Sequence, residues 1–181
     1  DPTDTSRRSD LINSLAWQGG VMLGGGDLRP AHERYGFAVV EAETLLVREP
    51  DNAAHKELLS SLLHLEAKTA EYLGNLDLAL TSYGRSLDIA EGLTRHDGEN
   101  ATWLFSLAVS LVDLGVACMQ DDRVVEAEKH LQRGADLGLG LVQSEPENID
   151  YLRNLAQAYG GLARTDAMAG DKNAADRHAD Q

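Results

Sequence analysis

The residues with the greatest capacity for chemistry are histidines and acidic residues, and one adjacent pair is His96-Asp97. An imidazole and a carboxylate side by side can hold a metal ion if a further His and Asp converge on it. His64 and Asp150 are available for that role. The pair falls, however, in a short segment that joins two predicted helices. We therefore expect no metal site at this position.

Two other motifs have a chemical interpretation. Asp121-Asp122 resembles the start of the aspartate-rich magnesium motif of terpene synthases, and His96-Asp97 resembles the metal ligands of HD-type phosphohydrolases. Val125 stands where the third Asp of the magnesium motif is needed, so we expect Asp121-Asp122 to lie at a turn and to cap a helix. The glycine-rich segment 19–27 lacks the preceding strand and the spacing of a phosphate-binding loop.

The remaining reactive residue is the single cysteine, Cys118. It cannot form a disulfide within the chain, and we expect a small buried hydrophobic residue rather than a reactive thiol. The six histidines are scattered and form no zinc-binding pair. The sequence therefore predicts no catalytic residue, no metal and no cofactor, and so no enzyme. A lone thiol also fits a reducing compartment, and we expect a cytoplasmic protein.

The composition predicts an all-α protein. The chain has 181 residues, with 28 Leu and 23 Ala but only 3 Ile, 10 Val and 8 Thr. Leu and Ala favour helices, whereas β-branched residues favour strands. Four prolines leave long stretches that can remain helical. At this length one domain, 1–181, is expected.

The charge excludes two classes of partner. A net charge of −14 and a pI near 4.7, without any Lys/Arg cluster, argue against nucleic acid and against anionic membrane surfaces. The most apolar stretch, 103–119, is interrupted by Asp113, and a central buried helix explains it better than a membrane span. The chain begins DPTDTSRRSD, without Met or an apolar leader, and we therefore expect an excised domain or an ordered fragment.

The elements that position these residues repeat every 48 residues. The junctions EPDN, HDGEN and EPEN place Asn52, Asn100 and Asn148 at that spacing. The copies are 4–51, 52–99, 100–147 and a partial 148–181. Four further columns keep the period: Leu11, Leu59, Leu107 and Leu155; Gly19, Ala67, Gly115 and Ala163; Gly26, Gly74, Asp122 and Gly170; and Ala31, Ala79, Ala127 and Ala175.

Each copy is predicted to form two helices. Asn at the junction is a good N-cap for a first helix of about 20 residues, and the Gly or Asp column forms the turn to the second. We expect the fourth copy to turn at Gly170-Asp171 and to continue as a helix over 173–181. The small residues let antiparallel helices approach closely, with the Ala column facing them. Because one hairpin cannot bury both apolar faces, stacked copies predict a solenoid.

These columns resemble the tetratricopeptide repeat (TPR) family. Leu63, Ala67, Gly74-Asn75, Ala79 and Tyr83 match its order of Leu, small residue, turn, Ala and aromatic residue. The usual period is about 34 residues, so each helix here is about two turns longer. In the third copy Asp121-Asp122 replaces the turn Gly and Leu131 the aromatic residue. Such long repeats are similar to those of large multidomain bacterial signalling proteins.

The resemblance implies a concave groove lined by the first helix of each copy. It implies an interaction scaffold for a peptide or a partner domain, and the apolar middle with flanking cations suits an acidic, hydrophobic peptide or an amphipathic helix. Two alternatives remain: a regulatory or sensor arm of a larger signalling enzyme, and self-association through an open solenoid end. The groove residues are Asn13, Ala16, Gly20, Ser61, His64, Lys68, Val109, Val112, Val116, Gln157, Gly160 and Arg164.

Overall fold

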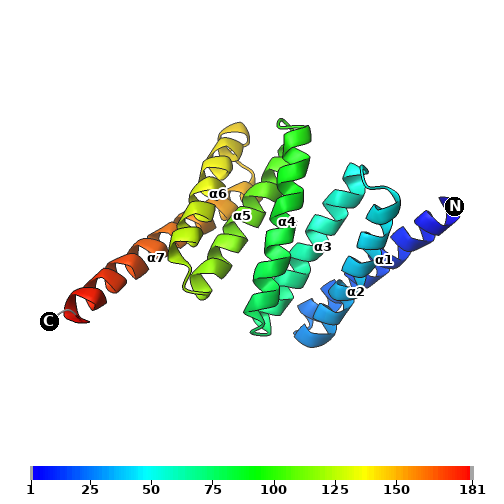
Figure 1. The fold of residues 1–181 in the computed structure, drawn as a ribbon. Coiled ribbons are helices and arrows are strands. Elements are labelled where there is room, and N and C mark those ends of the chain that lie inside the picture. Colours follow the sequence, from blue (N-terminus) through cyan, green and yellow to red (C-terminus); the bar gives the residue numbers. More distant parts are fainter. Residues whose placement is uncertain (1, 180–181) are drawn as a thin grey trace. The chain divides into compact units, whose positions relative to one another are not determined.

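The computed structural model describes the backbone of residues 2–179 and the side chains of residues 5–170. The described chain consists of helices joined by short connections, without a strand, which confirms the all-α prediction (Figure 1). It divides into two compact units, Asp1–Gly98 (unit 1) and Glu99–Gln181 (unit 2). The boundary between the units falls at the predicted junction of the second and third copies. The single domain over 1–181 stays a prediction.

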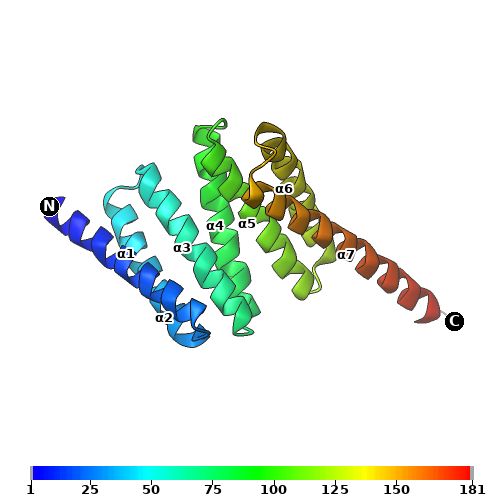
Figure 2. The same cartoon turned by 180° about the vertical axis from the view of Figure 1, so that it is seen from behind.

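Unit 1 contains two hairpins, which Figure 2 shows from behind. Each helix packs against the next along the chain, α1 on α2, α2 on α3 and α3 on α4. The N-cap prediction is confirmed, since the Asn52 side chain accepts a hydrogen bond from the His55 amide at 3.2 Å. The four helices are α1 (Pro2–Gly24), α2 (Leu28–Arg48), α3 (Ala53–Tyr72) and α4 (Leu76–His96).

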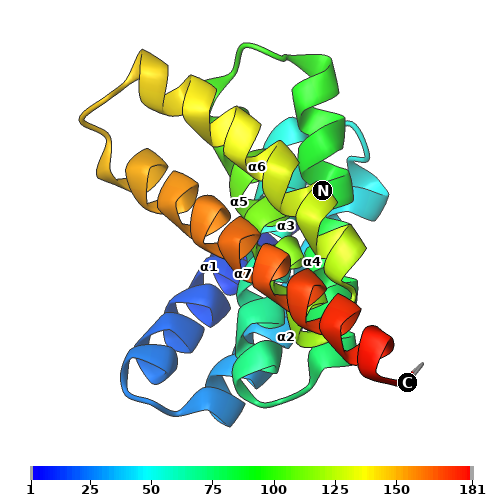
Figure 3. The same ribbon diagram turned by 90° about the vertical axis from the view of Figure 1, so that its left-hand side faces the viewer.

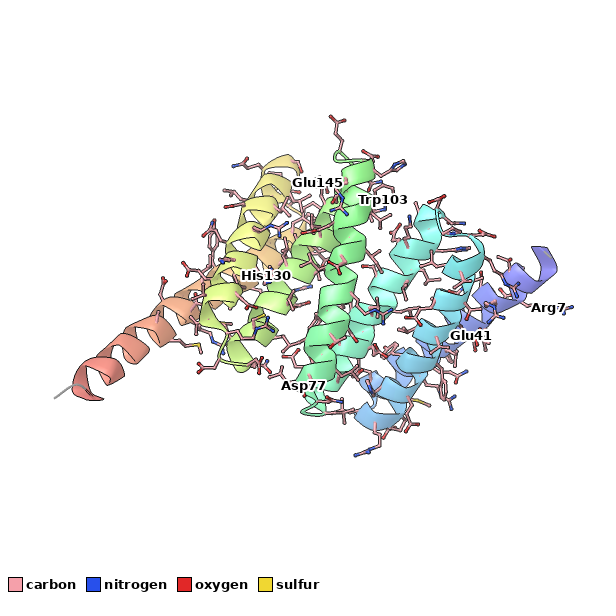
Figure 4. All side chains as sticks on the ribbon, viewed as in Figure 1. Arg7, Glu41, Asp77, Trp103, His130 and Glu145 are labelled. Atoms are coloured by element: carbon pink, nitrogen blue, oxygen red, sulfur yellow. The ribbon has the colours of Figure 1, made fainter. Side chains whose placement is uncertain are left out.

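Unit 2 contains a third hairpin followed by one long helix. The helices are α5 (Ala101–Gln120), α6 (Val124–Ser144) and α7 (Ile149–Ala179). The α6–α7 connection is visible in Figure 3, and α7 packs against both α6 and α5. The Asn100 side chain accepts a hydrogen bond from the Trp103 amide at 3.1 Å, and that of Asn148 accepts one from the Tyr151 amide at 3.3 Å. Trp103 and Glu145 mark the same end of the antiparallel α5–α6 pair (Figure 4).

The predicted turns are formed in the first three copies. Gly26 and Gly74 have φ values of 86° and 77°, a left-handed conformation that Gly adopts without a steric penalty. Asp122 takes the same conformation, with a φ of 58°. The Asp pair lies at this turn, as predicted, and Asp121 is the C-cap residue of α5, but neither Asp is the N-cap of α6. Arg123 occupies the N-cap of α6, and no side-chain cap hydrogen bond forms there.

The turn predicted at Gly170-Asp171 is also wrong, because α7 continues through it to Ala179. A Gly inside a helix costs about 1 kcal/mol relative to Ala, whereas a turn leaves the last carbonyl groups without helical partners. Ala167 and Ala169, just before Gly170, favour the helical continuation. Residues 180 and 181 of the predicted second helix lie outside the described part.

The small residues of the first helices allow the two helices of a hairpin to approach closely. The side chains nearest to them, however, are not those of the Ala column. A Cβ atom placed on Gly19 would lie 2.8 Å from the Tyr35 ring, and one on Gly115 would lie 2.7 Å from Leu131. The small residue of the first helix is therefore covered by a large residue of the second helix, Tyr35 or Leu131. This large residue comes four positions after the Ala of the second helix. Ala163 of α7 is exposed, and the Ala175 side chain lies outside the described part.

Buried polar contacts accompany this packing in unit 1. Ser60 of α3 and Ser86 of α4 are 5% and 1% exposed, and each hydroxyl donates to the carbonyl of the other residue, at 3.2 and 3.0 Å. Between α2 and α3, a ring nitrogen of His32 lies 3.0 Å from the Thr69 hydroxyl. Hydrogen bonds thus satisfy hydroxyl groups that would otherwise be costly to bury.

Candidate functional site

In unit 1 the predicted groove residues lie along one side of α1 and α3. Asn13 and Gly20 are exposed on α1, and Ser61 is exposed on α3. His64 and Lys68 are half-buried, one and two turns further along α3. The His64 ring packs edge-on against Tyr83 of α4, with ring centroids 5.7 Å apart. Ser61 and Lys68 are therefore better placed than His64 to meet a partner.

In unit 2 the predicted residues come from α5 and α7, which pack against each other. Val109 and Val116 of α5 are half-buried, and Gln157 and Arg164 of α7 are exposed. The Gln157 side-chain amide donates a hydrogen bond to the carboxylate of Asp113 at 2.9 Å, which joins the two helices between the valines.

Asp113 is a residue that sequence reasoning did not assign to this face. The sequence indicates that Asp113 is unusual, because it interrupts the apolar stretch. The spacing of residues does not, however, identify Gln157 as its hydrogen-bond partner. An amide–carboxylate hydrogen bond favours one alignment of the two helices. A partner at this face therefore meets apolar surface on either side of a polar centre.

Val112 does not belong to this face. It is fully buried in unit 2, and its Cγ2 atom lies 2.7 Å from where a Cβ atom of Gly134 would stand. Gly134 is on α6, so Val112 is a core residue of the α5–α6 hairpin. Its placement among the groove residues is wrong, because Val112 is 0% exposed, whereas Val109 and Val116 are half-buried.

In unit 1, His64 does not lie beside the His96-Asp97 pair. His96 is the last residue of α4 and Asp97 its C-cap, whereas His64 lies in the middle of α3 against Tyr83. Within residues 5–170, no three His, Cys, Asp or Glu side chains are placed to hold a metal ion.

Cys118 is 1% exposed, as predicted for a small core residue. Its burial raises the pKa of the thiol, an effect that Arg123 opposes only in part. Because the thiolate is the nucleophile, burial and a raised pKa both favour an inert thiol at neutral pH.

The outward side of the second helices holds a pattern that sequence reasoning missed. On α2, Phe37, Val40 and Val47 are 58%, 56% and 83% exposed. The equivalent positions one and two periods later are also exposed but polar: Arg85, Asp88 and Arg95 on α4, and Arg133, Asp136 and Gln143 on α6. The signal was available, since an apolar stripe in one copy stands where the other two carry polar residues.

The helix α5 is long and apolar enough to cross a membrane, by length and composition alone. Of its most apolar window, 56% is buried inside the protein. The apolar character of α5 is thus used largely within the fold, in agreement with the expected central buried helix.

No protein-family model matches the sequence, and no curated protein matches it.

Proposed function

We propose that the chain is a TPR-type protein that serves as an interaction scaffold and binds a peptide or a partner domain on its first helices. Three features support the proposal: the 48-residue period, the antiparallel hairpins within each unit, and the exposed or half-buried residues at the predicted groove positions of α1, α3, α5 and α7. Helical repeats commonly use such surfaces to bind proteins.

The observation that carries the proposal is the surface of α5 and α7. Val109 and Val116 are partly exposed on either side of the Asp113–Gln157 hydrogen bond, and Arg164 is exposed. Apolar side chains around a polar centre, with a cation nearby, suit an amphipathic helix with an acidic polar face. In unit 1, Lys68 supplies a second cation on the equivalent surface.

The test is selection of 15-residue peptides from a displayed library, followed by affinity measurements with the selected peptide. We expect the variant with both Val109→Asp and Val116→Asp to lose at least tenfold in affinity, and Arg164→Glu to weaken acidic peptides. The matched control is Val125→Asp, since Val125 is 66% exposed on α6, away from this surface. Selection of no peptide, or equal binding by all variants, would contradict the proposal.

A second candidate function is self-association, which the apolar stripe of α2 favours. Phe37, Val40 and Val47 follow a spacing of three and seven residues, so they share one side of the helix. Burying such residues against a second copy would remove apolar surface from water, at about 25 cal/mol per Å². A dimer should therefore appear in light scattering and should be lost with Phe37→Arg and Val47→Arg. The control is Asp88→Arg, at the polar position of α4 that corresponds to Val40. If the unmutated chain is a monomer, self-association is excluded as its function.

A further inference from the structure

Within the described part of unit 2, one side of α7 has no helix packed on it. Leu152 and Tyr159 are 43% and 49% exposed, and Ala156 and Ala163 are exposed between and after them. Their spacing of four, three and four residues places all four on one side of the helix. The adjoining side is fixed within unit 2, because Tyr151, Leu155 and Ala158 are buried.

The same positions in the two preceding copies show what covers this side. In α3 the equivalents of Ala156, Tyr159 and Ala163 are Ser60, Leu63 and Ala67, which are 5%, 0% and 0% exposed. The helix α4 packs against α3 there, with Ser86 hydrogen-bonded to Ser60.

In α5 the equivalents are Ala108, Leu111 and Gly115, all buried, and α6 packs against them. Leu131 of α6 lies directly over Gly115. The exposed side of α7 is thus the counterpart of two helix–helix interfaces within the same chain, and it continues the packed surface of the α6–α7 contact.

We propose that this side of α7 is a docking site for one antiparallel amphipathic helix of another polypeptide, with Ala four residues before Tyr or Leu. That pattern is shared by the helices that pack on the earlier first helices: Ala31 and Tyr35, Ala79 and Tyr83, and Ala127 and Leu131. The Ala lies close to the first helix, and the larger residue packs over the small residue, which in α7 is Ala163. The pair of Ala67 and Tyr83, 0% and 1% exposed, shows that an Ala at this position accommodates a Tyr.

The proposal is tested with a labelled synthetic peptide of residues 75–97, which includes all of α4, added to the full 181-residue chain. We expect saturable binding by fluorescence anisotropy and a rise in the thermal midpoint of the chain, since a ligand that binds only the folded state stabilises it. Tyr159→Glu and Ala163→Arg should each weaken binding at least tenfold. Circular dichroism confirms that both variants fold.

Two controls make the result specific. Arg153→Gln changes an exposed residue on another side of α7, one that belongs to neither proposed binding surface, and should leave peptide affinity unchanged. A peptide with Ala79→Glu should bind at least tenfold more weakly than the parent peptide. Equal binding by the parent chain and Tyr159→Glu, or no binding at about 1 mM peptide, a concentration that detects even weak contacts, would overturn the proposal. A dimer of the chain that Tyr159→Glu dissociates would assign the site to a second copy and overturn it as well.

Discussion

Leu131 of α6 occupies the space that a side chain at Gly115 of α5 would need. A Cβ atom on Gly115 would stand 2.7 Å from Leu131 Cγ and 3.2 Å from the Ala127 carbonyl oxygen. Both distances are shorter than ordinary van der Waals contacts. The close approach of α5 and α6 therefore depends on the absence of a side chain at Gly115, as it does at Gly134 of α6.

Gly115→Ala should lower the free energy of unfolding by about 1–2 kcal/mol, because overpacking costs more than the better helix propensity of Ala returns. Urea denaturation measures the difference. Gly160→Ala is the matched control: that glycine is exposed in α7 with nothing near its Cβ position, so the same change should stabilise the chain by about 0.5–1 kcal/mol. If both variants shift in the same direction, steric contact with Leu131 is not the cause.

Val112→Asp should abolish cooperative folding of unit 2 or lower its stability by about 3 kcal/mol or more, because it buries an unpaired carboxylate against α6. Far-UV circular dichroism during heating reports the loss. Val109→Asp, at a half-buried position three residues earlier, should cost far less. Equal helicity and equal thermal midpoints for the two variants would mean that Val112 is accessible to solvent.

Asn100→Ala should cost about 1 kcal/mol, because the Trp103 amide loses the side-chain acceptor that caps α5. Asn100→Ser keeps an acceptor and should retain most of the stability. Chemical denaturation of both variants provides the comparison. A loss of the same size in the Ser variant would show that the amide group acts through something other than capping.

Asp122→Gly should stabilise the chain by about 0.5–1 kcal/mol, because residue 122 has a φ of 58°, which costs a side-chain-bearing residue energy that Gly avoids. Gly74→Ala is the reverse experiment at the equivalent turn and should destabilise. Thermal midpoints of both variants measure the effect. Destabilisation by Asp122→Gly would mean that the Asp side chain contributes more than its backbone conformation costs.

Stability should fall at alkaline pH because burial raises the pKa of Cys118. The unfolded thiol loses its proton first, near its ordinary pKa of about 8.5, so the unfolded state then binds fewer protons than the folded one. The contribution is complete below that pH and is lost as pH rises toward the higher pKa of the folded state. Urea denaturation at pH 7–10 measures the decline, and Cys118→Ala should flatten it.

Much of the fold can be predicted from residues that lie close together in the sequence. The caps at Asn52, Asn100 and Asn148 and the turns at Gly26 and Gly74 depend on residues close in the chain, so a repeating pattern predicts them. The continuation of α7 through Gly170 did not follow, since one Gly tolerates either a helix or a turn, and the balance depends on packing. The prediction that Val112 lines the groove failed for a related reason. Helical spacing shows which residues share a side of a helix, but it does not show which neighbouring helix covers that side.

The candidate site was predictable only as a set of positions. Exposure of Asn13, Ser61, Gln157 and Arg164 agrees with the columns from which they were taken. The Asp113–Gln157 hydrogen bond joins residues 44 positions apart, and such a contact is fixed by how α5 and α7 pack, not by either segment alone.

The reciprocal hydroxyl pair of Ser60 and Ser86 has a consequence for how α3 and α4 find each other. Surfaces built from Ala, Gly and Leu can slide by a turn and still bury apolar area, so they define an alignment weakly. A shift of one turn would strand two hydroxyl groups in the interior, at about 1–3 kcal/mol each. The serine pair therefore specifies the alignment of α3 and α4, because other alignments lose these buried hydrogen bonds. A single buried polar residue specifies the register of a coiled coil in the same way.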